Sequence, residues 1–375
     1  MKIIVEKHIP FAQEAFSSLG EVELLPAAEI TNQRLQKADV LVIRTTTKIT
    51  PALLRNSRIS FLGTATIGTD HVDQEYLKEH DIAFTSAPGC NAEAVGEFVI
   101  NALVRLVHQK KLSLSDQILG IIGAGNTGSA LKRKAEALGI RCLLNDPPLQ
   151  QETGSPLYRP LEELLEQATV LSFHVPLVAQ GDHPTLSLLG LKEISKLGPA
   201  TILINCSRGG VLNERELVKN RAKFGGLILD VWENEPFISK ELIKVTDIAT
   251  PHVAGYSFDG KVKATEMIYQ ALCQHLQCAP SWSRESALIR EVSPLIVLDH
   301  PASLEQILSH AYDIFIDDRD LRQILKREDP DILFRRLRNQ YPLRREFAAC
   351  QVKNSSHLQE NLLVSLIQLG FQLQD

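Results

Sequence analysis

The sequence predicts an α/β fold with two doubly wound parallel sheets, followed by a smaller α+β segment at the C-terminal end. Short apolar runs rich in β-branched residues alternate with amphipathic segments until about residue 280, a pattern typical of parallel strands joined by crossover helices. The pattern changes after Cys278, where the Ser- and Pro-rich stretch APSWSRES indicates a connection. The length of 375 residues allows two or three domains of ordinary size.

In the first series, we expect strands and then one long helix. The helix is predicted over Ala92–His108, with apolar residues at i, i+3 and i+4 spacing and Asn91 at the N-cap position. The strands before it are predicted at Lys2–Glu6, Val22–Leu25, Ala38–Ile43 and Ile59–Leu62.

A second series of strands follows this helix, and the C-terminal segment is mixed. The second series is predicted at Ile118–Ile122, Arg141–Leu144, Val170–Phe173, Thr201–Asn205, Leu227–Val231 and Asp247–Ala249. The C-terminal segment is expected to contain strands at Leu295–Leu298 and Ala311–Ile316, and helices around Ser303–Leu308 and Ser356–Leu369.

Composition excludes several classes of protein. With 40 basic and 45 acidic side chains, a net charge of −5 and 44% apolar residues, the chain is neither fully disordered nor fibrous, and it is a poor candidate for binding nucleic acid or anionic membranes. No apolar stretch approaches the roughly 20 residues that a membrane span needs, and the N-terminus resembles a strand more than a signal peptide. Six scattered cysteines without CxxC spacing predict reduced thiols, a cytoplasmic location and no metal site.

A glycine-rich loop follows the strand Ile118–Ile122 and begins a predicted helix. In the sequence GAGNTG, Gly123 permits a tight turn, Gly125 lets the backbone approach a pyrophosphate, and Gly128 allows close packing of the helix on the strand. The helix start, with Asn126 and Thr127, supplies N–H groups and a positive dipole for the same anion. The order strand, loop, helix and strand predicts a dinucleotide site.

The acidic residue expected in such a site is Asp146, at the end of the next strand and roughly 20 residues beyond the first glycine. Its carboxylate is placed to accept hydrogen bonds from the adenosine ribose hydroxyls. Because the same charge repels a 2′-phosphate, the sequence predicts NAD rather than NADP as the cofactor.

Three further strands end in polar residues that singly have ordinary explanations. Arg208 follows Ile202–Asn205, Glu235 follows Leu227–Val231, and His252 follows Ile248–Pro251. Because ligands bind at the carboxyl ends of parallel strands, these side chains are expected near the dinucleotide loop.

Taken with GAGNTG, the segments Asn205–Gly210, DVWENEP and PHVAGY strongly resemble the D-isomer-specific 2-hydroxyacid dehydrogenase family. The resemblance implies that Arg208 binds the substrate carboxylate, that His252 is the acid/base and that Glu235 is its partner. Imidazole suits proton removal near neutral pH, and a guanidinium grips a carboxylate in two places. The resemblance also implies that Asp230 holds the nicotinamide carboxamide, and that the remaining cofactor contacts are Val175, Cys206, Ser207 and Gly255.

Within this family, several segments resemble members that act on a phosphorylated four-carbon acid. These segments are RTTTKI, GTATIGTDHVD, APGCNAEAVGE, NDPP, HVAGYSFDGK and the extension after residue 280. The reaction implied is oxidation of 4-phospho-D-erythronate to 2-oxo-3-hydroxy-4-phosphobutanoate, on the route to pyridoxal phosphate. Thr45, Thr66 and Tyr256 match substrate contacts, and Arg44 is a hypothetical additional phosphate ligand.

The resemblance also assigns domains. Residues 1–95 and 253–280 are expected to form a flavodoxin-like substrate-binding domain, residues 96–252 an NAD-binding Rossmann domain, and residues 281–375 a dimerisation domain of a homodimer. Arg344 and Arg345 in PLRREF have two explanations, surface charge or contact with a partner's substrate phosphate, and surface charge is favoured because charged pairs are normally solvated.

Two alternatives stay open at this point. The chain could be another member of the family, acting on phosphoglycerate, glycerate, lactate or formate. It could instead be an NAD-sensing binding protein that kept the fold and lost the chemistry. The joint presence of Arg208, Glu235 and His252 argues against the second alternative.

Overall fold

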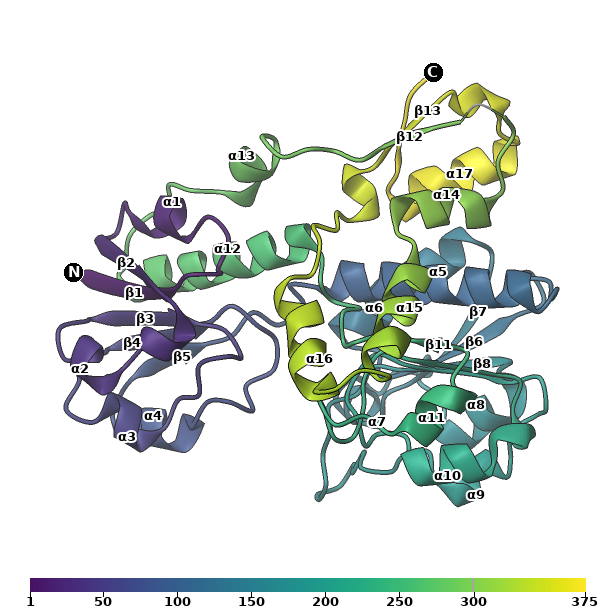
Figure 1. The fold of residues 1–375 in the computed structure, drawn as a ribbon, viewed down its shortest axis with the longest axis horizontal. Helices are drawn as coiled ribbons and strands as arrows, with labels where there is room; N and C mark the ends of the chain where they lie inside the picture. Colours follow the sequence, from purple (N-terminus) through teal and green to yellow (C-terminus); the bar gives the residue numbers. More distant parts are fainter. Residues whose placement is uncertain (299) are drawn as a thin grey trace. The chain divides into compact units, whose positions relative to one another are not determined.

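The computed structural model describes residues 1–298 and 300–375, and the chain divides into two compact units. Unit 1 comprises Met1–Asn91 and Ser257–Val292, and unit 2 comprises Ala92–Tyr256 and Ser293–Asp375. The predicted α/β fold is confirmed (Figure 1). The predicted domain boundaries and the dimerisation role of residues 281–375 stay predictions. Among the described residues, no helix combines the length and apolar character needed to cross a membrane.

Unit 1 is built on a five-stranded parallel sheet with the order β2-β1-β3-β4-β5. This is the order of the flavodoxin-like doubly wound fold, as the family resemblance implied. Its strands are β1 (Lys2–Glu6), β2 (Glu21–Leu25), β3 (Val40–Ile43), β4 (Phe61–Thr64) and β5 (Ala83–Thr85).

Helices on both sides of this sheet bury its apolar residues in two clusters. The packing is tight at Gly63 of β4, where a Cβ would lie 2.4 Å from Cγ2 of Ile268 in α12. The helices are α1 (Ala12–Phe16), η1 (Ala27–Glu29), α2 (Asn32–Leu35), α3 (Pro51–Leu54), α4 (Gln74–Glu79), α12 (Phe258–His275) and α13 (Arg284–Leu288).

Unit 2 contains a six-stranded parallel sheet with the order β11-β10-β9-β8-β6-β7. The chain order reverses between β6 and β8, and open α/β sheets bind their ligands outside the carboxyl ends of strands at such a switch point. The strands are β6 (Ile118–Ile122), β7 (Arg141–Asn145), β8 (Val170–Phe173), β9 (Ile202–Asn205), β10 (Gly226–Leu229) and β11 (Ile248–Ala249).

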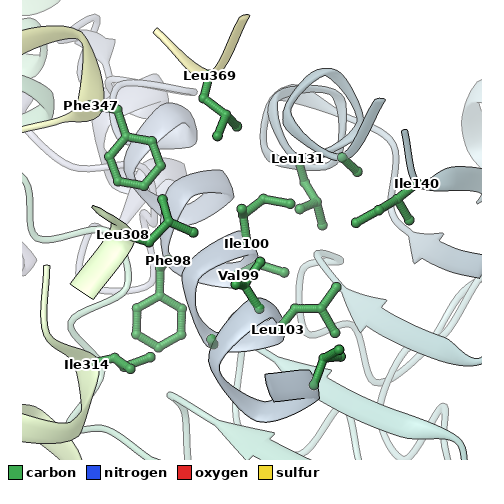
Figure 2. Packing of buried hydrophobic residues seen from close by; sticks show 14 of the residues in the cluster. Phe98, Val99, Ile100, Leu103, Leu131, Ile140, Leu308, Ile314, Phe347 and Leu369 are labelled. Atoms are coloured by element: carbon green, nitrogen blue, oxygen red, sulfur yellow. The ribbon is translucent and has the colours of Figure 1, made fainter. Parts of the chain in front are cut away.

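The long predicted helix forms as α5 (Ala92–Gln109), and it is buried along almost its whole length. Figure 2 shows α5 residues Phe98, Ile100 and Leu103 packed between α6 (Asn126–Ala137) and the C-terminal segment. The other helices in this part of unit 2 are α7 (Pro147–Thr153), α8 (Leu161–Gln167), α9 (Leu191–Ile194), α10 (Glu214–Lys219), η2 (Arg221–Lys223) and α11 (Lys240–Val245).

The C-terminal segment, Ser293–Asp375, adds a three-stranded parallel sheet and four α-helices to unit 2. The sheet order is β12-β13-β14. The elements are β12 (Leu295–Val297), α14 (Leu304–Ala311), α15 (Ile314–Ile324), α16 (Pro330–Asn339), η3 (Phe347–Ala349), β13 (Gln351–Lys353), η4 (Ser355–His357), α17 (Glu360–Leu369) and β14 (Gln372–Leu373).

One predicted strand in this segment is wrong. Residues 311–316 contain the end of α14 and the start of α15, and Asp313 caps α15 by accepting a hydrogen bond from the Phe315 N–H at 3.3 Å. A short apolar run fits a strand and a buried helix equally well, and here the capping aspartate and the helical sequence beyond it decide the outcome.

The C-terminal segment shares the core of unit 2. Leu308, Ile314 and Phe347 belong to the same buried cluster as the α5 residues, as Figure 2 shows. Hydrogen bonds also join α5 to the C-terminal segment. The buried amide of Asn101 donates to the carbonyls of Leu308 at 3.0 Å and Tyr312 at 2.8 Å. Residues 293–375 therefore share a hydrophobic core with the part of unit 2 that contains the six-stranded sheet.

A buried polar cluster fixes one end of this contact. Glu97 of α5 lies 3.2 Å from Nζ of Lys134 in α6, and both of its oxygens accept from the Phe347 N–H at 3.1 Å. Burial raises the pKa of the Glu97 carboxyl, and the charge of Lys134 opposes that rise. A buried acceptor with two buried donors is costly to remove because the donors lose their partners.

Glu97→Ala should therefore lower the free energy of unfolding by about 3 kcal/mol, measured by urea denaturation. Glu136→Ala is a matched control, since Glu136 pairs with Lys132 on the exposed face of α6 and should cost no more than about 0.5 kcal/mol. Equal losses in the two variants would contradict a structural role for the buried cluster.

Candidate active site

The glycine loop lies at the switch point between β6 and β8. Gly123 has φ of 90°, and a Cβ there would lie 2.8 Å from the backbone of His174 and 3.0 Å from Cγ1 of Val175. At Gly128 a Cβ would lie 2.1 Å from the Gly123 carbonyl oxygen. Both glycines are therefore required by the close approach of the loop to the β8 end and to its own helix.

Gly125 differs from these two glycines because the space around it is open, with no atom within 4 Å of the position that a Cβ would take. It is the N-cap of α6 and offers no side chain to the N–H groups of the first turn. Asn126 beside it is exposed and Thr127 is half-buried. Exposed backbone donors at the start of a twelve-residue helix fit the pyrophosphate of a dinucleotide.

Asp146 lies beside this loop at the end of β7. Its Oδ2 accepts from the Ala124 N–H at 2.8 Å, and its Oδ1 accepts from the Leu149 N–H at 3.1 Å, which caps α7. A carboxylate has about four acceptor positions, so both oxygens can accept further hydrogen bonds. The contact with Ala124 joins the predicted ribose-binding residue directly to the predicted pyrophosphate loop.

The loop after β9 carries Arg208. Asn205 holds this loop, because its Oδ1 accepts from Ser207 N at 3.0 Å and its Nδ2 donates to the Arg208 carbonyl at 2.9 Å. A Cβ on Gly209 would lie 1.9 Å from the Trp232 carbonyl oxygen, so only glycine lets this loop pack against the loop after β10.

Asp230 connects the ends of β10 and β11. Its buried carboxylate accepts from the Thr250 hydroxyl at 2.6 Å, from Val253 N at 2.8 Å and from Ala254 N at 2.9 Å. Burial raises the pKa of this carboxyl, while the charge of His252 and these donors oppose the rise. Between the tethered residues, His252 has φ of 58°, a left-handed conformation that costs energy for a non-glycine residue. Asp230 therefore maintains a strained turn, as well as lying where the family resemblance implies a carboxamide contact.

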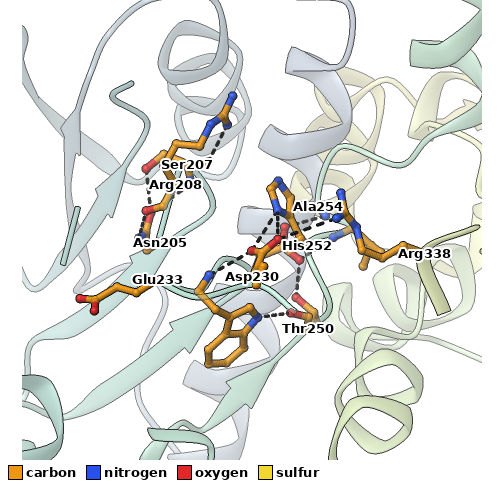
Figure 3. Close-up of polar contacts among 12 residues, drawn as sticks. Asn205, Ser207, Arg208, Asp230, Glu233, Thr250, His252, Ala254 and Arg338 are labelled. Carbon is orange, nitrogen blue, oxygen red and sulfur yellow. Dashed lines mark hydrogen bonds and ion pairs between the residues drawn. The ribbon is translucent and has the colours of Figure 1, made fainter. Parts of the chain in front are cut away.

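His252 and Glu235 form a hydrogen-bonded pair. Figure 3 shows His252 close to Asp230 and Thr250. Nδ1 of His252 lies 2.8 Å from Oε2 and 3.0 Å from Oε1 of Glu235, and Oε1 also accepts from the Trp232 N–H at 3.1 Å. Burial alone would raise the pKa of Glu235, but its hydrogen bonds with His252, the His252 charge and the Arg338 charge bring the pKa below its ordinary value. Glu235 is therefore an ionised acceptor beside the imidazole.

Comparisons with known proteins show which family the chain resembles. Residues 101–254 match the family model described as D-isomer specific 2-hydroxyacid dehydrogenase, NAD binding domain, and residues 287–370 match a domain of unknown function, DUF3410. The erythronate-4-phosphate dehydrogenase of Shewanella loihica is 40% identical over 99% of both chains. That of Hydrogenovibrio crunogenus is 40% identical over 99% of this chain and 98% of its own. The structure is also similar to the D-lactate dehydrogenase of Aquifex aeolicus solved with NAD and lactic acid, with a TM-score of 0.56 and 25% identity over 74% of this chain and 96% of that one.

The chain belongs to the erythronate-4-phosphate dehydrogenase family. It is an NAD-dependent oxidoreductase of the D-isomer specific 2-hydroxyacid dehydrogenase type. The roles of its individual residues stay predictions, and the geometry bears on them as follows.

Two nearby side chains lack the properties of reacting groups. Burial raises the pKa of the Cys206 thiol well above its ordinary value, and the Asp230 charge raises it further, so this thiol is a poor nucleophile. His174, after β8, has Nε2 2.9 Å from Ser172 Oγ, and burial lowers its pKa to about 4. His174 is therefore a neutral, structural residue at neutral pH. Gly255 and Tyr256 complete the turn after His252, with Tyr256 N donating to the Val253 carbonyl at 2.9 Å.

In unit 1, the segment that contains Arg44 and Thr45 is held by a residue that sequence reasoning missed. The buried Glu6, at the end of β1, accepts from Arg44 N at 3.0 Å, Thr46 Oγ1 at 2.5 Å and Thr47 Oγ1 at 2.8 Å. Three donors on one carboxylate fix this loop in a single conformation.

Thr66 belongs to a second hydroxyl network in unit 1. Its Oγ1 lies 2.8 Å from Thr64 Oγ1, which lies 3.1 Å from Nε2 of His71. His71 therefore takes part in this hydroxyl network.

Three arginines of the C-terminal segment were misjudged or missed. Arg344 and Arg345 are both buried, so their interpretation as surface charge is wrong. The Arg344 guanidinium donates to the carbonyl of Ala254 and stacks on the Tyr312 ring, 4.6 Å from its centroid. Arg338, which the sequence did not single out, lies 3.8 Å from Oε2 of Glu235. No local pattern in the sequence marks either contact.

The environment of His174 predicts a dependence of stability on pH. Its pKa is lowered from 6.5 to about 4 in the folded state, so folding favours the neutral ring. The resulting stabilisation, up to about 3 kcal/mol, is complete above about pH 6.5 and is lost as the pH falls toward 4. When the pH is lowered from 7.5 to 4.5, the free energy of unfolding, measured with urea, should fall by about 2 kcal/mol less in His174→Gln than in the wild type. The same substitution at the exposed His310 should leave the wild-type pH dependence unchanged, and an unchanged dependence in His174→Gln would contradict the assignment.

Proposed function

We propose that this chain oxidises 4-phospho-D-erythronate at its 2-hydroxyl group with NAD as acceptor, giving 2-oxo-3-hydroxy-4-phosphobutanoate for pyridoxal phosphate synthesis. Relatives at 40% identity over 99% of the chain carry the name erythronate-4-phosphate dehydrogenase, which supports the choice of substrate. The observation that carries the chemistry is the contact of both Glu235 oxygens with Nδ1 of His252.

This contact determines which nitrogen acts as the base. An ionised carboxylate can only accept hydrogen bonds, so Nδ1 of His252 must carry the proton between the two groups. In the neutral ring, Nε2 then holds the lone pair. In our proposal Nε2 takes the proton of the 2-hydroxyl group, and Glu235 stabilises the imidazolium that forms.

Arg208 has the complementary role of binding the substrate carboxylate. Its Nη1 donates to the Ser207 carbonyl at 2.8 Å, and the other donors of its guanidinium can form the paired hydrogen bonds that carboxylates accept. NAD, when bound, accepts the hydride from the carbon that carries the hydroxyl group. The loop Gly123–Gly128, Asp146 and Asp230 are the residues that would hold it, with Val175, Cys206, Ser207 and Gly255 as further contacts.

Substrate contacts, assembly and location complete the proposal. Arg44, Thr45, Thr66 and Tyr256 are the proposed substrate contacts. A homodimer is supported by exposed apolar side chains on the edge strand β12, where Leu295 and Val297 are each 49% exposed. A cytoplasmic location is supported by the free thiols of Cys142, Cys206, Cys273 and Cys278.

Initial rates of NADH formation test the substrate. We expect kcat/KM for 4-phospho-D-erythronate to exceed that for D-erythronate, D-glycerate and D-lactate by at least about a hundredfold, since the site must leave polar phosphate-binding groups unpaired with the others. His252→Gln should lower kcat for the preferred acid by about 10³-fold, which controls for a contaminating dehydrogenase. A preference for an unphosphorylated acid would overturn the proposed substrate.

Asp146→Asn tests the cofactor assignment. The amide oxygen of asparagine can keep the cap on α7 but cannot also accept from the Ala124 N–H. The substitution removes the charge that repels a 2′-phosphate, so the ratio of kcat/KM for NADP to that for NAD should rise about tenfold or more. Thermal unfolding checks that the cap is intact. Equal use of NADP and NAD by the unmodified enzyme, or an unchanged ratio in the variant, would contradict the role of Asp146.

A further inference from the structure

Two arginines of the C-terminal segment contact the proposed active site. Arg344 binds the turn that follows His252, and Arg338 approaches Glu235. Arg344 donates to the carbonyl of Ala254, and the Ala254 N–H donates to Asp230, so both backbone groups of this residue are held. Arg338 approaches the pair itself, with Nη1 3.8 Å from Oε2 of Glu235. Figure 3 shows Arg338 reaching toward His252 and Ala254 from the C-terminal segment.

The position of Arg338 is fixed by aromatic contacts. It lies in the last turn of α16, and Phe334, one turn earlier, is almost completely buried. The Arg338 guanidinium carbon lies 5.5 Å from the centroid of the Tyr256 ring and 5.9 Å from that of Phe334. In the described part of the chain its Nε is buried without a hydrogen-bond partner. Two rings and a buried stem therefore direct the charge toward Glu235.

The charged groups that face the His252–Glu235 pair are few. Asp230 acts on His252 from the end of β10, and Glu214, from the start of α10, acts on Glu235. Glu233, in the loop after β10, is next to Glu214, donating its N–H to the Glu214 carboxylate at 2.6 Å. Arg338 is the cation that approaches Glu235, and Arg344 is a second cation, bound to the Ala254 carbonyl. Both belong to the segment that matches a domain of unknown function.

We propose that Arg338 is a positioning residue that acts through Glu235, holding its carboxylate and opposing proton uptake by the His252–Glu235 pair. This inference rests on the proposed function of that pair. A cation beside the pair favours its unprotonated state, in which the net charge is negative, over the state in which His252 is charged. Because oxidation needs an unprotonated base, Arg338 extends the activity of the enzyme toward lower pH.

The test compares full-length Arg338→Met, Arg338→Gln and Arg338→Lys with the wild type. In the pH profile of kcat/KM for oxidation of 4-phospho-D-erythronate, the acidic midpoint should move up by about half to one pH unit in the two neutral variants. Their kcat/KM near pH 6 should fall about threefold to tenfold as a result. The lysine variant keeps the positive charge, so its acidic midpoint should lie close to that of the wild type. Arg335→Met, on an exposed position of the same helix, should behave as the wild type.

A second readout needs no substrate. The titration midpoint of the His252 imidazole, followed by NMR of histidine-labelled protein and assigned with His252→Asn, should move up in Arg338→Met by the same amount as the kinetic midpoint. This measurement stands even where 4-phospho-D-erythronate proves to be the wrong substrate, so the two proposals fail separately. Where Arg338→Met does not fold, Arg338→Gln carries the same expectation.

Two results would overturn the inference. The first is an unmoved midpoint in both neutral variants by both methods. The second is a raised KM for 4-phospho-D-erythronate with no change for D-erythronate and no moved midpoint, which would make Arg338 a direct ligand of the substrate phosphate.

Discussion

The buried carboxylate of Asp230 is the interaction on which the geometry of the active site depends. It is 1% exposed, and burying a carboxylate is unfavourable unless donors surround it. Two of its three donors are backbone N–H groups of the turn that begins at His252. The cost of burial is offset only while this turn keeps its shape. Asp230 thereby stabilises the left-handed conformation of His252, which few non-glycine residues adopt without such support.

The remaining site residues follow from the parallel sheet. Strands β6 to β11 all end at one edge, so the glycine loop, Arg208, Asp230 and His252 meet there although they are far apart in the chain. Contacts between the loops then refine the positions. Gly209 brings the Arg208 loop against Trp232, and the Trp232 N–H binds Glu235. The proposed carboxylate ligand and the proposed base are thus linked through a short series of backbone and side-chain contacts.

The part of the site that could be predicted is the part that a strand and its following loop contain. Each predicted strand of unit 2 is recognisable from its apolar run, and the predicted site residues follow these strands in the chain. They are GAGNTG, Asp146, Arg208, Glu235 and His252. Glu6 is different, because its three partners lie about 40 residues further along the chain and only the pairing of β1 with β3 brings them together. Arg344 and Arg345 were expected at the surface because arginine pairs normally are. The Tyr312 ring and the Ala254 carbonyl provide Arg344 with a buried environment that no local pattern encodes. The error at residues 311–316 has a local origin, because the length of an apolar run does not distinguish a strand from a capped helix.

The contacts of the C-terminal segment join its structural role to the role that we propose for it at the active site. The segment packs against α5 through Leu308, Ile314 and Phe347. It contacts Glu235 through Arg338 and the Ala254 carbonyl through Arg344. Its helices α15 and α16 connect these two sets of contacts, and Arg322 of α15 donates to the carbonyls of Ile243 at 2.8 Å and Thr246 at 2.7 Å beside β11. A small displacement of the segment therefore moves both guanidinium groups together, that of Arg338 beside Glu235 and that of Arg344 on the Ala254 carbonyl. Because a shift of about 1 Å in an acid/base group is enough to slow catalysis about a hundredfold, the packing of this segment constrains the chemistry as strongly as the sheet does.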